Sequence, residues 1–171
     1  MKKFLSVLGV ATALFATTLM AGGSTTLPTT TGWYGGVSAS SNNFGYNADN
    51  TYGVGLQVGK DVCVAGPFTM SLEARANRTV ENDNTVDTYL GLMKPGVDFQ
   101  IVKVYGLAGY GVTDSANQSG FTDGFVYGGG VSKNLVGNVD VFADYVVNSD
   151  FQFCGNEYSY KTFNVGLNYN F

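Results

Sequence analysis

The stretch that decides the fold is "YKTFNVGLNYNF", residues 160–171. Apolar residues alternate with small or polar ones throughout it: Phe163, Val165, Leu167, Tyr169 and Phe171 stand against Thr162, Asn164, Gly166, Asn168 and Asn170. Successive side chains of a strand point to opposite faces of a sheet, so this period of two predicts a strand with one apolar and one polar face. The stretch also ends on an aromatic residue, which a surface strand does not require.

The same period recurs along the rest of the chain. We expect strands at 32–41, 51–60, 67–77, 85–93, within 97–113, at 124–133 and at 139–148, with the opening stretch as the eighth. Connections alternate in length, with longer polar loops after the first, third, fifth and seventh strands and shorter turns after the others. Strands of roughly ten residues are long enough to cross a bilayer when tilted.

Two of these strands carry apolar residues on both faces. In 85–93 we expect Val86, Leu90 and Leu92 to share the apolar face, opposite Asp87 and Tyr89, with a tight turn following at 94–96. In 97–113 the register stays open, since a glycine bulge can switch the faces. The competing sets are Phe99, Ile101, Tyr105 and Leu107 against Val102, Val104, Ala108 and Val112.

The N-terminus predicts export. Met1, Lys2 and Lys3 precede the apolar run "FLSVLGVATALFATTLM" and the small residues that follow it. This pattern is typical of a cleaved secretory signal, which we place at residues 1–21, followed by a flexible lead-in at 22–31. We therefore expect export through the Sec pathway, with the strands lying within residues 32–171.

Alternation alone fits two kinds of barrel. A soluble, ligand-binding barrel turns its apolar face inward, whereas a membrane barrel turns that face to lipid and its polar face to the lumen. Charged residues make up 13% of the chain, against about 25% in typical soluble domains. If the polar faces formed the outer surface of a soluble barrel, that surface would carry unusually few charges. We favour the membrane barrel, in which Glu73, Arg75, Asp87 and Asp144 form a polar network in the lumen.

The whole pattern resembles the small eight-stranded bacterial outer-membrane barrels of the OmpA/OmpX-like family, from about Gly32 to Phe171. "GWYGGVSAS" and "VYGLAGYG" are similar to that family's first and central strands. The resemblance implies an all-β, eight-stranded, antiparallel up-and-down transmembrane β-barrel. It also implies that the terminal face of Phe163, Val165, Leu167, Tyr169 and Phe171 is an assembly signal for the barrel-assembly machinery.

This topology predicts where aromatic and charged residues lie. Trp33, Tyr52 and Tyr145 suit the aromatic girdles at the membrane interfaces. We expect Lys60, Lys94 and Lys133 at periplasmic turns and an acidic outer face, in which Arg78 is the main positive charge, with these carboxylates: Asp49, Glu81, Asp83, Asp114, Asp123, Asp150 and Glu157. Such a face repels nucleic acid, and it can share divalent cations with lipopolysaccharide phosphates.

The sequence predicts neither a disulfide bond nor a catalytic site. Cys63 and Cys154 are expected at opposite ends of the barrel, too far apart for a disulfide. The chain has no His, which excludes a His-dependent triad, a His-based zinc site and a His acid/base, and we predict no cofactor or metal site. We expect a non-enzymatic role in envelope integrity and surface interactions. The alternatives are a narrow channel for small polar solutes and a soluble periplasmic ligand-binding barrel.

Overall fold

The computed structural model describes residues 32–43, 51–81, 84–115, 121–153 and 156–171. The predicted signal peptide, the lead-in and Cys154 lie outside these residues. The strands are β1 (Trp33–Asn43), β2 (Thr51–Ala65), β3 (Phe68–Glu81), β4 (Asn84–Asp98), β5 (Lys103–Ser115), β6 (Phe121–Val136), β7 (Val139–Phe153) and β8 (Asn156–Asn170). Among the described residues, no helix is long and apolar enough to cross a membrane.

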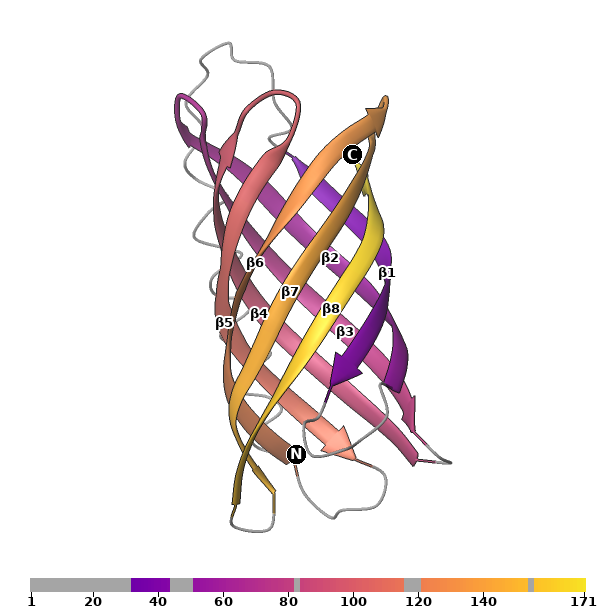
Figure 1. Ribbon diagram of the computed structural model, residues 1–171. Helices are drawn as coiled ribbons and strands as arrows, with labels where there is room; N and C mark the ends of the chain where they lie inside the picture. The colour runs from indigo at the N-terminus through magenta and orange to yellow at the C-terminus, as the bar shows by residue number, and fades with distance from the viewer. Residues whose placement is uncertain (1–31, 44–50, 82–83, 116–120, 154–155) are drawn as a thin grey trace.

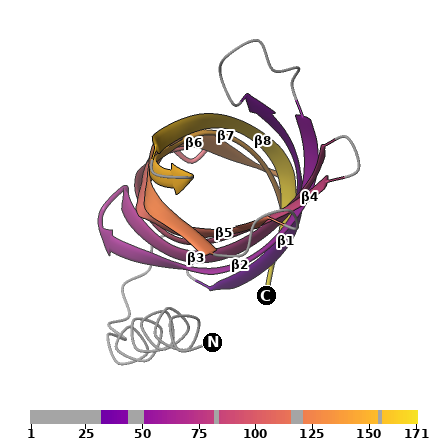
Figure 2. The same cartoon turned by 90° about the horizontal axis from the view of Figure 1, so that it is seen from below.

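The eight strands form one closed antiparallel barrel in which each pairs with its sequence neighbours and β8 pairs with β1. Figure 1 shows the strands tilted around a common axis, and Figure 2, along that axis, shows the ring they make. Closure leaves no unpaired strand edge, which is what a sheet surrounded by lipid requires. The predicted fold class is therefore confirmed.

The two ends of the barrel differ. The end at the top of Figure 1, here called the turn end, holds the short connections after β2, β4 and β6 and the C-terminus. Gly66 and Gly137 have φ values of 55° and 57° there, each the first of two central residues, as in a type II′ hairpin turn. The opposite end, with the connections after β1, β3, β5 and β7, is here called the loop end.

Apolar residues cover the outside of the barrel. Along β8 and at Phe171, which follows it, the odd-numbered residues from Phe163 onward are exposed, while Thr162 and Asn164 are buried in the lumen. The same arrangement holds on β2, where Val54, Leu56 and Val58 point outward. A soluble barrel would bury these side chains, so the apolar outer wall contradicts the soluble alternative and supports a lipid-facing surface.

The structure corrects the prediction for β4. Leu90 and Leu92 point into the lumen, and Tyr89 and Met93 point outward, the reverse of the predicted faces. The strand also continues to Asp98, so the tight turn predicted at 94–96 is absent. Narrow barrels fill their interior with side chains, and two leucines serve this purpose as well as polar groups do.

In β5 the structure settles the open register. Tyr105 and Leu107 face the lumen, whereas Val104, Ala108 and Val112 face outward. The pairing with β4 keeps one register on both sides of the unpaired stretch, so no bulge switches the faces.

Candidate functional site

A cluster of four charged side chains lies in the lumen. Glu73 and Arg75 are two residues apart on β3 and therefore share its inner face. Arg75 reaches across to β7, where its Nη1 and Nη2 donate to the two carboxylate oxygens of Asp144 at 3.1 and 2.8 Å. Lys94 of β4 donates to Glu73 Oε2 at 2.5 Å. Two acids and two bases thus neutralise one another.

Every charge in this cluster is buried and hydrogen-bonded. The side chains of Glu73, Arg75 and Asp144 are 0% exposed, and that of Lys94 is 5% exposed. Glu73 also accepts bonds from Arg75 Nε at 3.0 Å and from the Tyr34 hydroxyl at 2.7 Å. Burying a charge is costly unless it is paired and hydrogen-bonded, so each group in this cluster depends on the others.

Aromatic rings surround the two cations. The Arg75 guanidinium lies 5.5 Å from the centre of the Phe142 ring, and Lys94 Nζ lies 5.7 Å from the same centre. Lys94 Nζ also lies 4.9 Å from the centre of the Tyr105 ring. These cation–π contacts add attraction that is strengthened where water is excluded. Phe142 fits because Gly166 faces it, where a Cβ would lie 2.6 Å from the ring.

An apolar cluster also fills the lumen. It consists of buried residues of β4, β5, β6 and β7: Leu90, Leu92, Tyr105, Leu107, Val126 and Val146. Opposed to these are polar groups of the other strands, among them Asn42, whose amide donates to Thr79 at 3.0 Å and accepts from Thr162 at 2.8 Å. The lumen is therefore packed on one wall by apolar side chains and linked on the other by hydrogen bonds.

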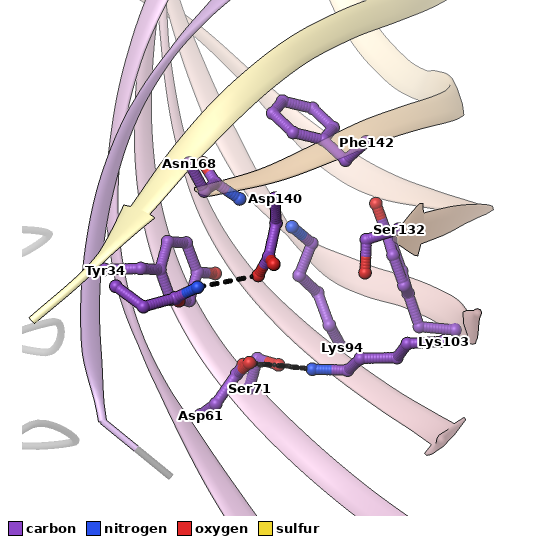
Figure 3. Close-up of a pocket in the computed structure, with 11 residues that line it drawn as sticks. Tyr34, Asp61, Ser71, Lys94, Lys103, Ser132, Asp140, Phe142 and Asn168 are labelled. Atoms are coloured by element: carbon purple, nitrogen blue, oxygen red, sulfur yellow. Dashed lines mark hydrogen bonds and ion pairs between the residues drawn. The ribbon is translucent and has the colours of Figure 1, made fainter. Parts of the chain in front are cut away.

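A cavity lies between Lys94 of the ionic cluster and the turn end, and Figure 3 shows the side chains that line it. Its empty volume is about 320 Å³, including the part open to solvent. Lys103 spans it, donating to Asp61 at 2.9 Å and to Ser71 at 3.1 Å. Lys94 lies at its inner limit, where the charged cluster begins. The cavity therefore ends at Lys94, whose side chain is 5% exposed.

The structure does not place Asp87 with the other predicted lumen residues. Asp87 lies on the outer wall near the loop end, where both its oxygens accept bonds at 2.8 Å from Arg78 on the neighbouring strand. This correction follows from the reversed faces of β4. Lys94 takes the place in the cluster that had been expected for Asp87, and is not at a turn.

Sequence reasoning missed Lys94 and Tyr34. A signal for Lys94 existed, because its even number places it on the face of Leu90 and Leu92, opposite Tyr89 and Met93. Placing a lysine in lipid costs far more free energy than placing it in a lumen beside a partner. The position of Lys94 therefore predicts that the face it shares with the two leucines points into the lumen. Nothing in the sequence around Tyr34 identifies Glu73 as its partner, because the two lie on different strands.

The remaining predicted positions all lie on the outer wall. Trp33, Tyr52 and Tyr145 point outward, and Trp33 lies near the turn end with Lys60 Nζ 5.7 Å from its ring centre. The terminal face is exposed in full: Phe163, Val165, Leu167, Tyr169 and Phe171. These placements suit contact with lipid. In the described part of the chain, no three acidic or cysteine side chains are grouped to hold a metal ion.

Known outer-membrane proteins share this barrel fold. The sequence model of the outer membrane protein beta-barrel domain matches residues 8–171. The chain belongs to this family. It is therefore an integral outer-membrane protein, as the apolar outer wall requires. No curated protein sequence matches the chain.

Solved structures with similar folds include barrels from Yersinia pestis and from Neisseria. Ail, the attachment invasion locus protein of Yersinia pestis, is 21% identical with a TM-score of 0.60, and the match covers 82% of this chain and 97% of Ail. Neisserial surface protein A is 15% identical with a TM-score of 0.58, covering 81% and 97% respectively. At these identities the likeness shows the shared barrel fold.

Proposed function

We propose that this protein is a closed, non-enzymatic barrel that contributes to the integrity of the outer membrane and contacts its surroundings through the connections at the loop end. The observation that carries this proposal is the filled lumen, where the ionic cluster of Glu73, Arg75, Lys94 and Asp144 lies with the apolar cluster. A barrel without an open passage acts through its surfaces instead of through transport.

The ionic cluster is the main barrier to conduction. The bidentate bond from Arg75 joins β3 to β7, strands that are not neighbours in the barrel. A passing ion would have to separate this pair, which leaves buried charges without their partners and is strongly unfavourable. An interior of eight strands is otherwise just wide enough to be filled by side chains.

The loop end supports a role at the outer surface. With the turn end in the periplasm, Asp114 and Asp123 are exposed at the outer end, and the sequence predicts further carboxylates in the connections there. One Ail structure holds the heparin analogue sucrose octasulfate. For this chain we expect no such binding, because an acidic surface repels polyanions. Lipopolysaccharide and, during assembly, the barrel-assembly machinery are the partners that we propose.

Conductance in planar lipid bilayers tests the closed lumen. We expect the refolded protein, with its fold verified by heat-modifiable electrophoretic mobility, to show no discrete current steps. The double variant Arg75→Ser, Asp144→Ser removes the cross-lumen pair and should produce current steps, which shows that the assay detects an opening. Steps of equal size from the unmodified protein would contradict the proposal.

A role in envelope integrity needs a test in cells. A strain lacking the protein should be more sensitive to detergents and large antibiotics, and the unmodified gene should restore resistance. Unchanged sensitivity would contradict the role in envelope integrity. If the barrel also shows no conductance, the surface role is the part of the proposal that stands.

The second candidate is a narrow channel for small polar solutes, favoured by the cavity at the turn end. This cavity reaches Lys94, so the ionic cluster and the apolar cluster separate the cavity from the loop end. Uptake of small polar solutes into vesicles containing the unmodified protein would favour this candidate over the closed barrel.

A further inference from the structure

Five large apolar side chains are exposed at the turn end, either in a short connection or in the last two residues of the strand that leads into one. They are Val64 (64% exposed), Phe99 (60%), Ile101 (73%), Leu135 (53%) and Val136 (78%), together here called the apolar rim. Short turns are usually made of Gly, Asn, Asp, Ser and Pro, which suit water. Exposed apolar side chains in or directly beside all three turns therefore call for an apolar partner.

The backbone directs these side chains outward. The pairing of β2 with β3 skips Val64, and the pairing of β6 with β7 skips Leu135, so each is the extra residue of a bulge next to its turn. Bulges re-aim side chains. In the third turn, Gln100 has a φ of 70°, and its N–H donates to the Asp98 carboxylate at 2.7 Å. Its neighbours Phe99 and Ile101 are both exposed.

The rim continues the lipid-facing wall. Phe68 is the first residue of β3 after one turn, and Val104 is the second residue of β5 after another, and both are exposed on the outer wall. No charged side chain of the outer wall separates Phe99 and Ile101 from Val97 and Val104. At the connection between β4 and β5 the lipid-facing wall and the rim are thus one apolar surface, whereas on β2 and β6 the outward-facing Lys60 and Lys133 stand between the wall and the rim.

The length of the wall indicates why the rim is needed. Outward-facing residues are uninterruptedly apolar over nine positions in each of four strands: 68–76, 89–97, 104–112 and 163–171. At the loop end the next outward residue is charged in each case: Arg78, Asp87, Asp114 and Lys161. Nine residues rise about 26 Å along a strand and about 20 Å across a membrane at a tilt of about 40°. The apolar band of an outer-membrane barrel is about 25 Å tall.

We infer that the apolar rim inserts into the phospholipid leaflet at the turn end and supplies the missing height of the apolar band. Lys60 and Lys133 point outward from β2 and β6 close to this end. Long lysine stems lie along apolar surface while their ammonium groups extend to the polar headgroups, so both residues are compatible with an inserted rim. The occupant of the rim is lipid and not a protein, because the rim continues an established lipid contact. The inference rests on the family assignment and not on the proposed function.

Tryptophan fluorescence in vesicles tests this inference. Trp33→Phe removes the one native Trp, and Ile101→Trp or Val136→Trp then reports from the rim. In phospholipid vesicles without any other protein, we expect blue-shifted emission, quenching by lipids brominated near the headgroup, and protection from iodide. Leu167→Trp in the middle of the wall is the lipid-exposed control, and it should be quenched best by lipids brominated deeper in the chain.

The contrary result is equally clear. Emission typical of water, with quenching by iodide and none by brominated lipid, would overturn the inference, and the rim would then be a surface for a protein partner. Heat-modifiable mobility checks that each variant is folded. Phe99→Trp is the conservative substitute if either rim variant fails to fold, and the same two outcomes decide the question.

Discussion

Two Arg–Asp pairs three residues apart on β3 have opposite surroundings. Arg75 bonds Asp144 across the lumen with both side chains fully buried, whereas Arg78 bonds Asp87 on the outer wall with side chains 63% and 25% exposed. Both pairs are bidentate, with bonds of 2.8–3.1 Å in one and 2.8 Å in the other. Geometry alone therefore does not distinguish them.

The difference teaches that surroundings decide what an ion pair contributes. Water screens the outer pair and can hydrate either partner once the other is removed. The lumen offers no such replacement, so a lone charge left there is strongly destabilising. The inner pair also joins strands that are not neighbours, while the outer pair joins β3 to β4, which already share a hydrogen-bonded ladder.

The largest effect is expected from Arg75→Met. This change leaves Asp144 and Glu73 without their shared partner, and the free energy of unfolding should fall by about 3–5 kcal/mol. Urea unfolding in vesicles, followed by Trp33 fluorescence, measures it. Adding Asp144→Asn should restore part of the loss, because one uncompensated charge is removed. A loss from Arg75→Met no larger than that from a surface variant would show that water reaches the cluster freely.

A smaller effect is expected from Lys94→Met. Glu73 keeps its bonds from Arg75 and Tyr34, so only one of its partners is lost. We expect unfolding free energy to decrease by about 1–3 kcal/mol, measured by the same urea titration. Lys133→Met, on the outer wall, is the matched control and should change the midpoint less. Equal effects would indicate that burial of Lys94 contributes nothing.

The smallest effect is expected from Arg78→Ala. The outer pair is screened, so its removal should leave the urea midpoint nearly unchanged, and high salt should not alter that result. A large loss of stability would mean that lipid surrounds this pair and excludes water from it. The outer limit of the membrane would then lie beyond Arg78.

Strict alternation made most of the fold predictable. β8 and β3 have apolar residues on one face only, so their faces followed directly from the period of two. β4 and β5 have large apolar residues on both faces, as in Leu90 against Tyr89, and the period then does not say which face is inside. The position of Lys94 resolves β4, because the cost of placing a lysine in lipid exceeds the cost of leaving leucines in a packed lumen.

The candidate site was predictable only in part. Glu73, Arg75 and Asp144 stand on polar faces in mid-strand, which was enough to place them in the lumen. Their partners depend on strand tilt and on which strands face each other across the barrel. Residues such as Phe142 and Tyr34 therefore entered the cluster without a local signal in the sequence.

The seam between β1 and β8 has a consequence for the kinetics of assembly. Tyr34 pairs with Asn170, so this ladder joins the two strands that are farthest apart in sequence. Pairings of long sequence separation are slow to form, because much chain entropy is lost before they are made. Until this seam forms, every intermediate has two unpaired strand edges, and lipid offers no hydrogen-bond partner for the backbone N–H and C=O groups along them. Closure of the seam should therefore be the late, committing step of assembly, and its reopening should limit the rate of unfolding.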